Sequence, residues 1–203
     1  MKNKFYIFLT IFYCLFACNQ ASADTRNMFL HAGFGYGTYS VKFKDEGLSG
    51  VQSKVMNFNF GFGYKLQKRE FFTELYAGFL GNLNQNDATR KKEDIDIKFN
   101  GNNNAFLGML NFGKKYARFE PFLIGGLAFS ALSYQASSIQ KNYLNLGVIY
   151  GIGFNIPSNE NKNTVFTFKL IGIQGFKRKD CYELKSTQVN HLFLNIGANY
   201  YFN

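Results

Sequence analysis

Residues 56–66 read Met-Asn-Phe-Asn-Phe-Gly-Phe-Gly-Tyr-Lys-Leu. Every even position in this stretch is apolar or aromatic, and every odd position is Asn, Gly or Lys. A period of two is that of a β-strand, whose successive side chains point to opposite faces. Alternating Asn and Gly form a poor solvent surface, but they suit the crowded interior of a narrow barrel. The stretch also has the ~9–11 residues that a membrane strand needs, so it predicts a strand with its apolar face toward lipid.

The same alternation recurs along the chain, which holds 25 Phe, 13 Tyr and 20 Gly but only two Pro. Eight strands are predicted, at 28–43, 54–67, 70–83, 103–114, 119–134, 143–156, 164–177 and 188–203. Long polar connections are expected at 44–53, 84–102, 135–142 and 178–187, and shorter ones at 67–69, 115–118 and 157–163. Long loops at one end and short turns at the other are typical of outer-membrane barrels. The predicted fold class is therefore all-β, an eight-stranded antiparallel up-and-down transmembrane β-barrel, with a lumen just filled by side chains.

The N-terminus has the layout of a cleavable signal peptide. Lys2 and Lys4 precede an apolar stretch at 5–18, and the small residues Ala21-Ser22-Ala23 follow it. About 14 apolar residues are too few for a helix that spans a bilayer. We expect residues 1–23 to be a signal peptide that exports the chain, and residues 24–203 to be the barrel.

Cysteine use leaves one alternative open at this processing site. Leu15-Phe16-Ala17-Cys18 is similar to a lipoprotein signal, in which the cysteine carries the lipid. Cleavage after Ala23 would leave Cys181 alone, so no disulfide could form within the mature chain. Charged residues surround Cys181, which is expected to be an unreactive loop residue.

The chain is basic, with a net charge of +10. Its charges lie in short groups between the apolar stretches, as expected of turns and loops beside anionic lipid headgroups. No nucleic-acid-binding motif accompanies them, so no nucleic-acid partner is expected.

Four charged residues fall on the inward face of their predicted strands. They are Lys65, Glu74, Glu120 and Lys169. A Lys on the lipid face would cost ~2–4 kcal/mol at mid-bilayer, and buried charges need partners. The predicted pairs are Lys65 with Glu74 on the neighbouring strand, and Lys169 with Glu120 across the lumen. This lumen charge network is interpreted as a plug that closes the barrel, with an ion or proton path as the alternative.

No catalytic residue, metal ligand or cofactor site is predicted. The only histidines are His31 and His191. Both fall on the inward face of strands that adjoin when the barrel closes, where they could approach each other. Two His without a third ligand form a poor metal site. Neither has a Ser two residues later, as a lipid deacylase with an activated serine would require.

Three stretches resemble a known family. They are Phe71–Phe79 (Phe-Phe-Thr-Glu-Leu-Tyr-Ala-Gly-Phe), Glu120–Gly126 (Glu-Pro-Phe-Leu-Ile-Gly-Gly) and Gly197–Phe202 (Gly-Ala-Asn-Tyr-Tyr-Phe). They are similar to the eight-stranded opacity-protein and OmpA-like barrels of Gram-negative bacteria. Members ending in an aromatic residue present it to the barrel-assembly machinery, whereas here Asn203 follows Phe202.

The resemblance implies a surface antigen, an adhesin or a membrane-stabilising barrel in the outer membrane. Expected partners are outer-membrane lipids and lipopolysaccharide, the assembly machinery and a host surface molecule, and the barrel is expected to be a monomer. A non-enzymatic surface protein with four external loops is the function predicted; a small pore and a lipid-A-modifying enzyme are the alternatives. Length and charge point to the 84–102 loop as the external contact region. Its charged residues are Arg90, Lys91, Lys92, Glu93, Asp94 and Asp96.

Overall fold

The computed structural model describes residues 25–43, 51–83, 88–92, 95–136, 139–158, 163–176 and 187–202. These form nine β-strands. The strands are β1 (Thr25–Phe43), β2 (Val51–Lys68), β3 (Phe71–Asn82), β4 (Ala88–Lys92), β5 (Ile95–Lys114), β6 (Glu120–Ala136), β7 (Ile139–Pro157), β8 (Thr164–Gly175) and β9 (Thr187–Phe202). Within the described residues, no helix is long and apolar enough to cross a membrane.

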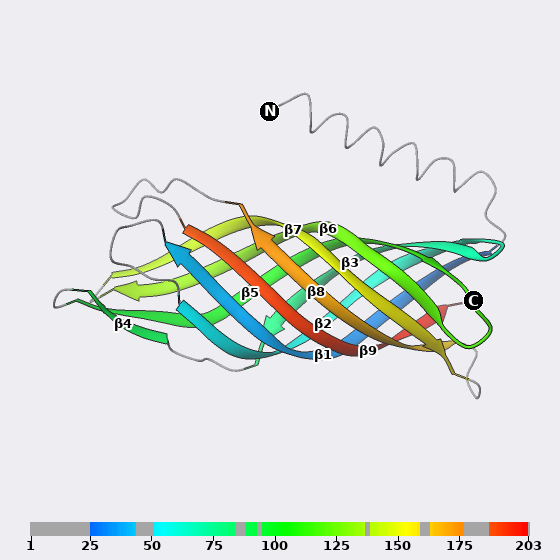
Figure 1. The fold of residues 1–203 in the computed structure, drawn as a ribbon, viewed down its shortest axis with the longest axis horizontal. Coiled ribbons are helices and arrows are strands. Elements are labelled where there is room, and N and C mark those ends of the chain that lie inside the picture. The colour runs from blue at the N-terminus through cyan, green and yellow to red at the C-terminus, as the bar shows by residue number, and fades with distance from the viewer. Residues whose placement is uncertain are drawn as a thin grey trace, which may run out of the picture.

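Eight of the strands close into an antiparallel barrel (Figure 1). The order is β3-β2-β1-β9-β8-β7-β6-β5, and β3 pairs with β5 to complete the ring. The short strand β4 stands outside this ring and pairs with the beginning of β5. Each strand of the ring runs antiparallel to both of its neighbours, and this includes the pair of β5 and β3. The prediction of an eight-stranded up-and-down barrel is therefore confirmed.

The two ends of the barrel differ. At one end, here called the turn end, lie the two-residue turn Arg69–Glu70, the connection 115–119, the residues Ser158 and Asn163 that follow β7 and precede β8, and the described chain ends Thr25 and Phe202. At the opposite end, here called the loop end, lie β4 and the strand ends Phe43, Val51, Asn82, Ala136 and Ile139. Backbone hydrogen bonds close the turn end, for example from the Lys115 amide to the Glu70 carbonyl at 2.6 Å.

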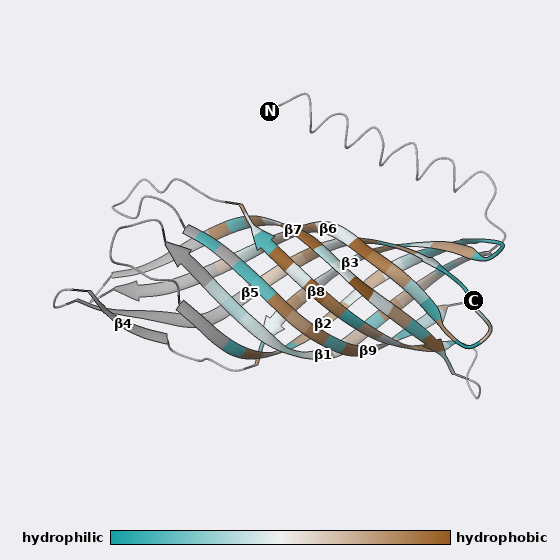
Figure 2. Cartoon of the chain, viewed as in Figure 1, coloured by the Kyte–Doolittle hydropathy of each residue, from teal (hydrophilic) through white to brown (hydrophobic). Residues whose placement is uncertain are grey.

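Alternation separates the two faces of the wall as predicted. Phe60 is 54% exposed on the outside, whereas its neighbour Asn59 is 1% exposed in the lumen. Ile152 is 56% exposed, and Figure 2 shows apolar residues alternating with polar ones along the strands. Leu66 and Thr73 depart from the rule. Both occupy outward positions but are buried, at 3% and 8% exposure.

The structure corrects two of the predicted loops. The 84–102 region holds β4 and the first eight residues of β5, and the two strands pair from Ala88 with Phe99 to Lys92 with Ile95. At 135–142, β6 and β7 remain paired up to Ala136 and Ile139. Polar residues end a strand inside a membrane, but beyond the membrane a paired strand tolerates them on both faces. The polar composition of these segments therefore predicted loops where the structure has paired strands.

The inward aromatic rings at the turn end lie over glycines of the next strand. Phe72 is paired with Gly113, and Phe122 with Gly153. A Cβ added at either glycine would lie 2.5 Å from the Cζ atom of the facing ring. Phe29 and Gly63 form a third such pair. Glycine is required at these positions because any side chain would displace the ring.

Candidate functional site: a charged cluster in the barrel lumen

A cluster of buried charges lies in the lumen near the turn end. Lys65, near the end of β2, is directly opposite Glu74 on β3, and Glu120 is the first residue of β6. The Lys65 ammonium donates a hydrogen bond to Glu120 Oε2 at 2.6 Å and lies 3.7 Å from Glu74 Oε1. The three residues are 7%, 1% and 3% exposed in the order Lys65, Glu74, Glu120. One ammonium group therefore serves two buried carboxylates.

Uncharged donors complete the shell around the carboxylates. Glu74 accepts hydrogen bonds from Asn111 Nδ2 at 3.0 Å, Tyr201 Oη at 3.0 Å and Asn155 Nδ2 at 3.3 Å. The Asn155 amide also lies 3.3 Å from Glu120 Oε2. Hydrogen bonds to a carboxylate are shorter and stronger than those between neutral groups. The network joins side chains from β2, β3, β5, β6, β7 and β9, so it links six of the eight barrel strands.

The partner predicted for Lys169 is wrong. Lys169 is buried on β8 at 2% exposure, but no carboxylate lies within 4.0 Å of its ammonium group in the described part of the chain. Its ammonium lies 5.1 Å from the centroid of the Tyr76 ring, a cation–π contact. Glu120 instead pairs with Lys65, because Glu120 lies near the turn end at the depth of Lys65 and not at that of Lys169. Strand stagger decides this depth, and alternation alone does not give it.

The two histidines are both buried, but they do not approach each other. His31 on β1 is paired with Asn199 of β9, whereas His191 is paired with Tyr39, eight residues further along β1. His31 Nδ1 lies 2.7 Å from Asn199 Oδ1, and its Nε2 lies 3.0 Å from Asn59 Oδ1. The His191 ring packs against Tyr39 at 5.2 Å between centroids. Each histidine is thus held by its own lumen neighbours.

Both apolar and polar side chains fill the lumen between the charged cluster and the loop end. Five strands contribute buried apolar side chains there. Among these are Leu80, Leu107, Ile149, Ile173 and Phe193. A side-chain-filled interior is what eight strands should enclose. Asn59, Ser130 and His191 are buried in the same part of the lumen, so a mixed layer of apolar and polar side chains lies between the charged cluster and the loop end.

The predicted external contact region lies at the loop end. Arg90, Lys91 and Lys92 belong to β4, and Asp96 belongs to β5, where it is paired with Lys91. Glu93 and Asp94 lie outside the described residues, as do the signal peptide, Cys18 and Cys181. In the part of the chain that the structure describes, no three His, Cys, Asp or Glu side chains form a group that could hold a metal ion.

Sequence reasoning did not single out Asn111, Asn155 and Tyr201 as members of the cluster. Their signal was present, because each occupies an inward position of its strand at the same end as Glu74. Treating every inward polar residue as a candidate hydrogen-bond partner would have included them.

No protein-family model and no curated protein matches this sequence. Solved structures do match its fold. One is Ail, the attachment invasion locus protein of Yersinia pestis, in complex with the heparin analogue sucrose octasulfate. That match covers 88% of this chain and 100% of Ail, with 14% identity and a TM-score of 0.50. Neisserial surface protein A matches over 88% of this chain and 100% of its own, with 10% identity and a TM-score of 0.54. The chain therefore has the fold of small outer-membrane barrels.

Proposed function

We propose that the chain is a non-enzymatic outer-membrane surface protein, closed to solutes, that presents an external sheet to molecules outside the cell. The observation that carries this proposal is how far β4, β5, β6 and β7 reach at the loop end. β5, β6 and β7 have 20, 17 and 19 residues. β1 and β2 are also long, with 19 and 18 residues, but at the loop end β4, β5, β6 and β7 form a sheet that extends past the ends of the other strands (Figure 1).

The extension is long in comparison with a membrane. Twenty residues at ~3.3 Å each span roughly 65 Å, or about 50 Å along an axis from which the strand is tilted by ~40°. The apolar band of an outer-membrane barrel is only ~25 Å tall, with short turns toward the periplasm and long segments outside. The long strands therefore extend about 20 Å beyond the lipid on the outer side, on the same estimates. A register shift between Asn100 and Asn104 marks where β5 leaves the regular wall.

Charge supports contact with an acidic partner. The sequence from 88 to 99 contains four basic and three acidic residues, and the sequence from 177 to 187 contains four basic and two acidic residues. Ail, which shares the fold, binds a sulfated heparin analogue. We therefore propose a sulfated glycan as the type of molecule that the external segments contact.

The test uses whole cells and a heparin surface. Cells that express the protein should adhere, and the triple change Arg90→Gln, Lys91→Gln, Lys92→Gln should weaken adhesion by about tenfold. The matched control, Lys115→Gln with Arg118→Gln, removes cations from the opposite end and should have no effect. Equal adhesion of all three strains would refute glycan binding by this segment. Single-channel recordings in planar bilayers test the closed lumen, and lipid A mass spectra of the expressing strain test the absence of enzyme activity.

A further inference from the structure

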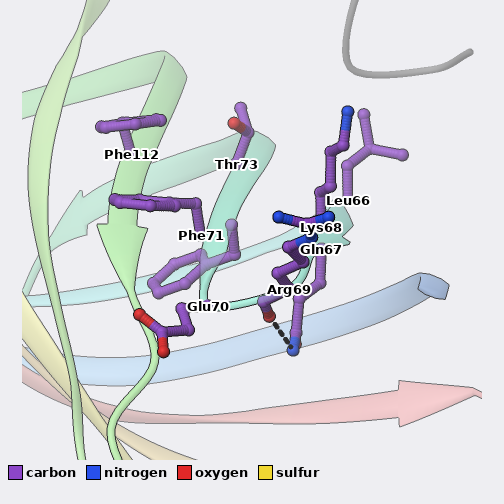
Figure 3. A pocket seen from close by; sticks show the side chains of 9 residues that line it. Leu66, Gln67, Lys68, Arg69, Glu70, Phe71, Thr73 and Phe112 are labelled. Atoms are coloured by element: carbon purple, nitrogen blue, oxygen red, sulfur yellow. Dashed lines mark hydrogen bonds between the residues drawn. The ribbon is translucent and has the colours of Figure 1, made fainter. Parts of the chain in front are cut away.

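A cleft of about 730 Å³ lies on the outer surface of the barrel at the turn end. Its lining comes from the end of β2, the Arg69–Glu70 turn, the start of β3 and one residue of β5. The residues are Leu66, Gln67, Lys68, Arg69, Glu70, Phe71, Phe72, Thr73 and Phe112. Figure 3 shows the Phe71 and Phe112 rings on one side and Leu66 and Lys68 on the other, with Thr73 between them. The volume is in the range of pockets that bind small molecules.

The cleft is apolar toward the middle of the barrel and basic toward its end. Strand register places Leu66, Thr73 and Phe112 in one row across β2, β3 and β5. The next row toward the turn holds Lys68, Phe71 and Lys114. Thr73 is the smallest side chain of the first row, and the low exposure of Thr73 and Leu66 places them at the bottom of the recess. The two rows therefore separate an apolar floor from a cationic rim.

Among the described residues of the rim, basic side chains outnumber acidic ones. Glu70 is the only carboxylate among the described lining residues, and it forms an ion pair with Lys114 at 3.0 Å. Lys68 and Arg69 are exposed at the same edge. Arg69 has a φ of 53°, a conformation that Gly or Asn usually adopts in turns. Gln67 Nε2 donates a hydrogen bond to the Arg69 carbonyl at 3.1 Å and so holds the turn.

Aromatic rings place the cleft at the boundary between lipid and water. The Phe71 and Phe112 rings stack at 6.1 Å between centroids, and Tyr116 stacks on Phe119 at 5.1 Å. The Lys114 ammonium lies 5.7 Å from the Phe71 centroid and 5.3 Å from that of Tyr116. Aromatic girdles of this kind mark the interfaces of membrane barrels. Since short turns face the periplasm, this interface is that of the periplasmic leaflet.

We propose that this cleft binds an anionic phospholipid of the periplasmic leaflet. The phosphate lies against Lys68 and Arg69, and one acyl chain lies over Thr73 between Leu66 and Phe112. Charge complementarity and the order of the two rows favour a phospholipid. Along the membrane normal, the cationic rim lies outside the apolar floor, just as the charged headgroup of a phospholipid lies outside its acyl chains. This inference does not depend on the external function proposed above.

The absence of Trp from the chain allows a local test. A Phe112→Trp variant places one fluorescent reporter in the cleft wall and keeps an aromatic ring there. The barrel is refolded in phosphatidylcholine vesicles that contain brominated phosphatidylglycerol or brominated phosphatidylcholine, and quenching gives the relative affinity at that position. A second reporter, Phe154→Trp, lies in an aromatic pair with Phe168 on strands remote from the cleft. We expect about a tenfold preference for phosphatidylglycerol at position 112 and little preference at position 154.

Two charge variants complete the test. Adding Lys68→Gln and Arg69→Gln to the position-112 reporter should abolish the preference. Adding Lys115→Gln and Arg118→Gln, which removes the same charge from the same end but outside the cleft, should preserve it. Equal quenching by the two lipids at position 112, an equal preference at position 154, or equal loss in both charge variants would each overturn the proposal. Native mass spectrometry of the wild-type barrel with equimolar amounts of the two lipids gives an independent readout, in which one phosphatidylglycerol adduct is expected.

Discussion

Removing the Lys65 ammonium should destabilise the barrel more than any other single change in the charged cluster. The ammonium group lies 2.6 Å from Oε2 of Glu120 and 3.7 Å from Oε1 of Glu74, and both carboxylates are almost fully buried. Lys65→Met would leave two buried negative charges without a cation at contact distance. Breaking a buried ion pair from one side costs about 3–5 kcal/mol. That loss is a large part of the ~5–15 kcal/mol by which folded domains are stable.

The same distances predict the order of the stability losses for the other substitutions in the lumen. Glu120→Gln should cost less than Lys65→Met, because Lys65 keeps Glu74 as a partner. In the double variant, Glu74 keeps its three neutral donors, so the two losses should not add. We expect a coupling free energy of ~1.5–3 kcal/mol between positions 65 and 120. Lys169→Met should cost less than Lys65→Met, because no carboxylate of the described residues lies within ion-pair distance of Lys169.

Urea unfolding from lipid vesicles, followed by circular dichroism and by heat-dependent electrophoretic mobility, measures these free energies. A matched control is the ion pair of Lys114 with Glu70 at 3.0 Å, whose side chains are 38% and 67% exposed. Water screens exposed pairs of this kind, so they contribute little to stability, and Lys114→Met should change stability little. A silent Lys65→Met, or a coupling energy below ~0.5 kcal/mol between positions 65 and 120, would refute the view that this cluster holds the barrel together.

Three further predictions concern other parts of the chain. N-terminal sequencing of the membrane-bound protein should give a mature chain that begins at Asp24, and a lipid-modified Cys18 at the N-terminus would contradict it. Phe60→Arg should lower the free energy of unfolding by ~2–4 kcal/mol because this position faces lipid. An unchanged free energy of unfolding from vesicles would show that position 60 does not face the lipid. Gly153→Val should lower stability by ~1–3 kcal/mol through overpacking against Phe122, and the double variant with Phe122→Ala should recover part of that loss.

The number of barrel strands and the facing of their side chains were predictable from the sequence because alternation encodes both directly. Phe60 and Asn59 lie on opposite faces as the period-two pattern requires. The inward placement of Lys65, Glu74, Glu120 and Lys169 follows from the same parity, and all four are buried.

Depth along the barrel axis was not predictable. Which inward residues meet depends on the stagger between strands, and a strand of alternating residues reads the same at each shift of two. The partner of Glu120 was therefore assigned wrongly, and His31 and His191 were placed closer together than they lie. The ends of β5, β6 and β7 were missed for another reason. Residues 95–99 do alternate, as Ile-Asp-Ile-Lys-Phe, but their charge was taken as the mark of a loop.

The phenylalanine–glycine pairs at the turn end bear on this ambiguity of register. A slip of one residue between neighbouring strands would turn every apolar side chain inward, so the alternation itself opposes it. A slip of two residues preserves the alternation, and hydrophobicity gives no protection against it. At the β3–β5 pairing, such a slip would bring Asn111 or Lys115 opposite Phe72 in place of Gly113. The Phe72 ring would then clash with a side chain, because it fits only against a residue that has none. Gly113 therefore opposes, by steric exclusion, a shift of two residues in the pairing of β3 with β5.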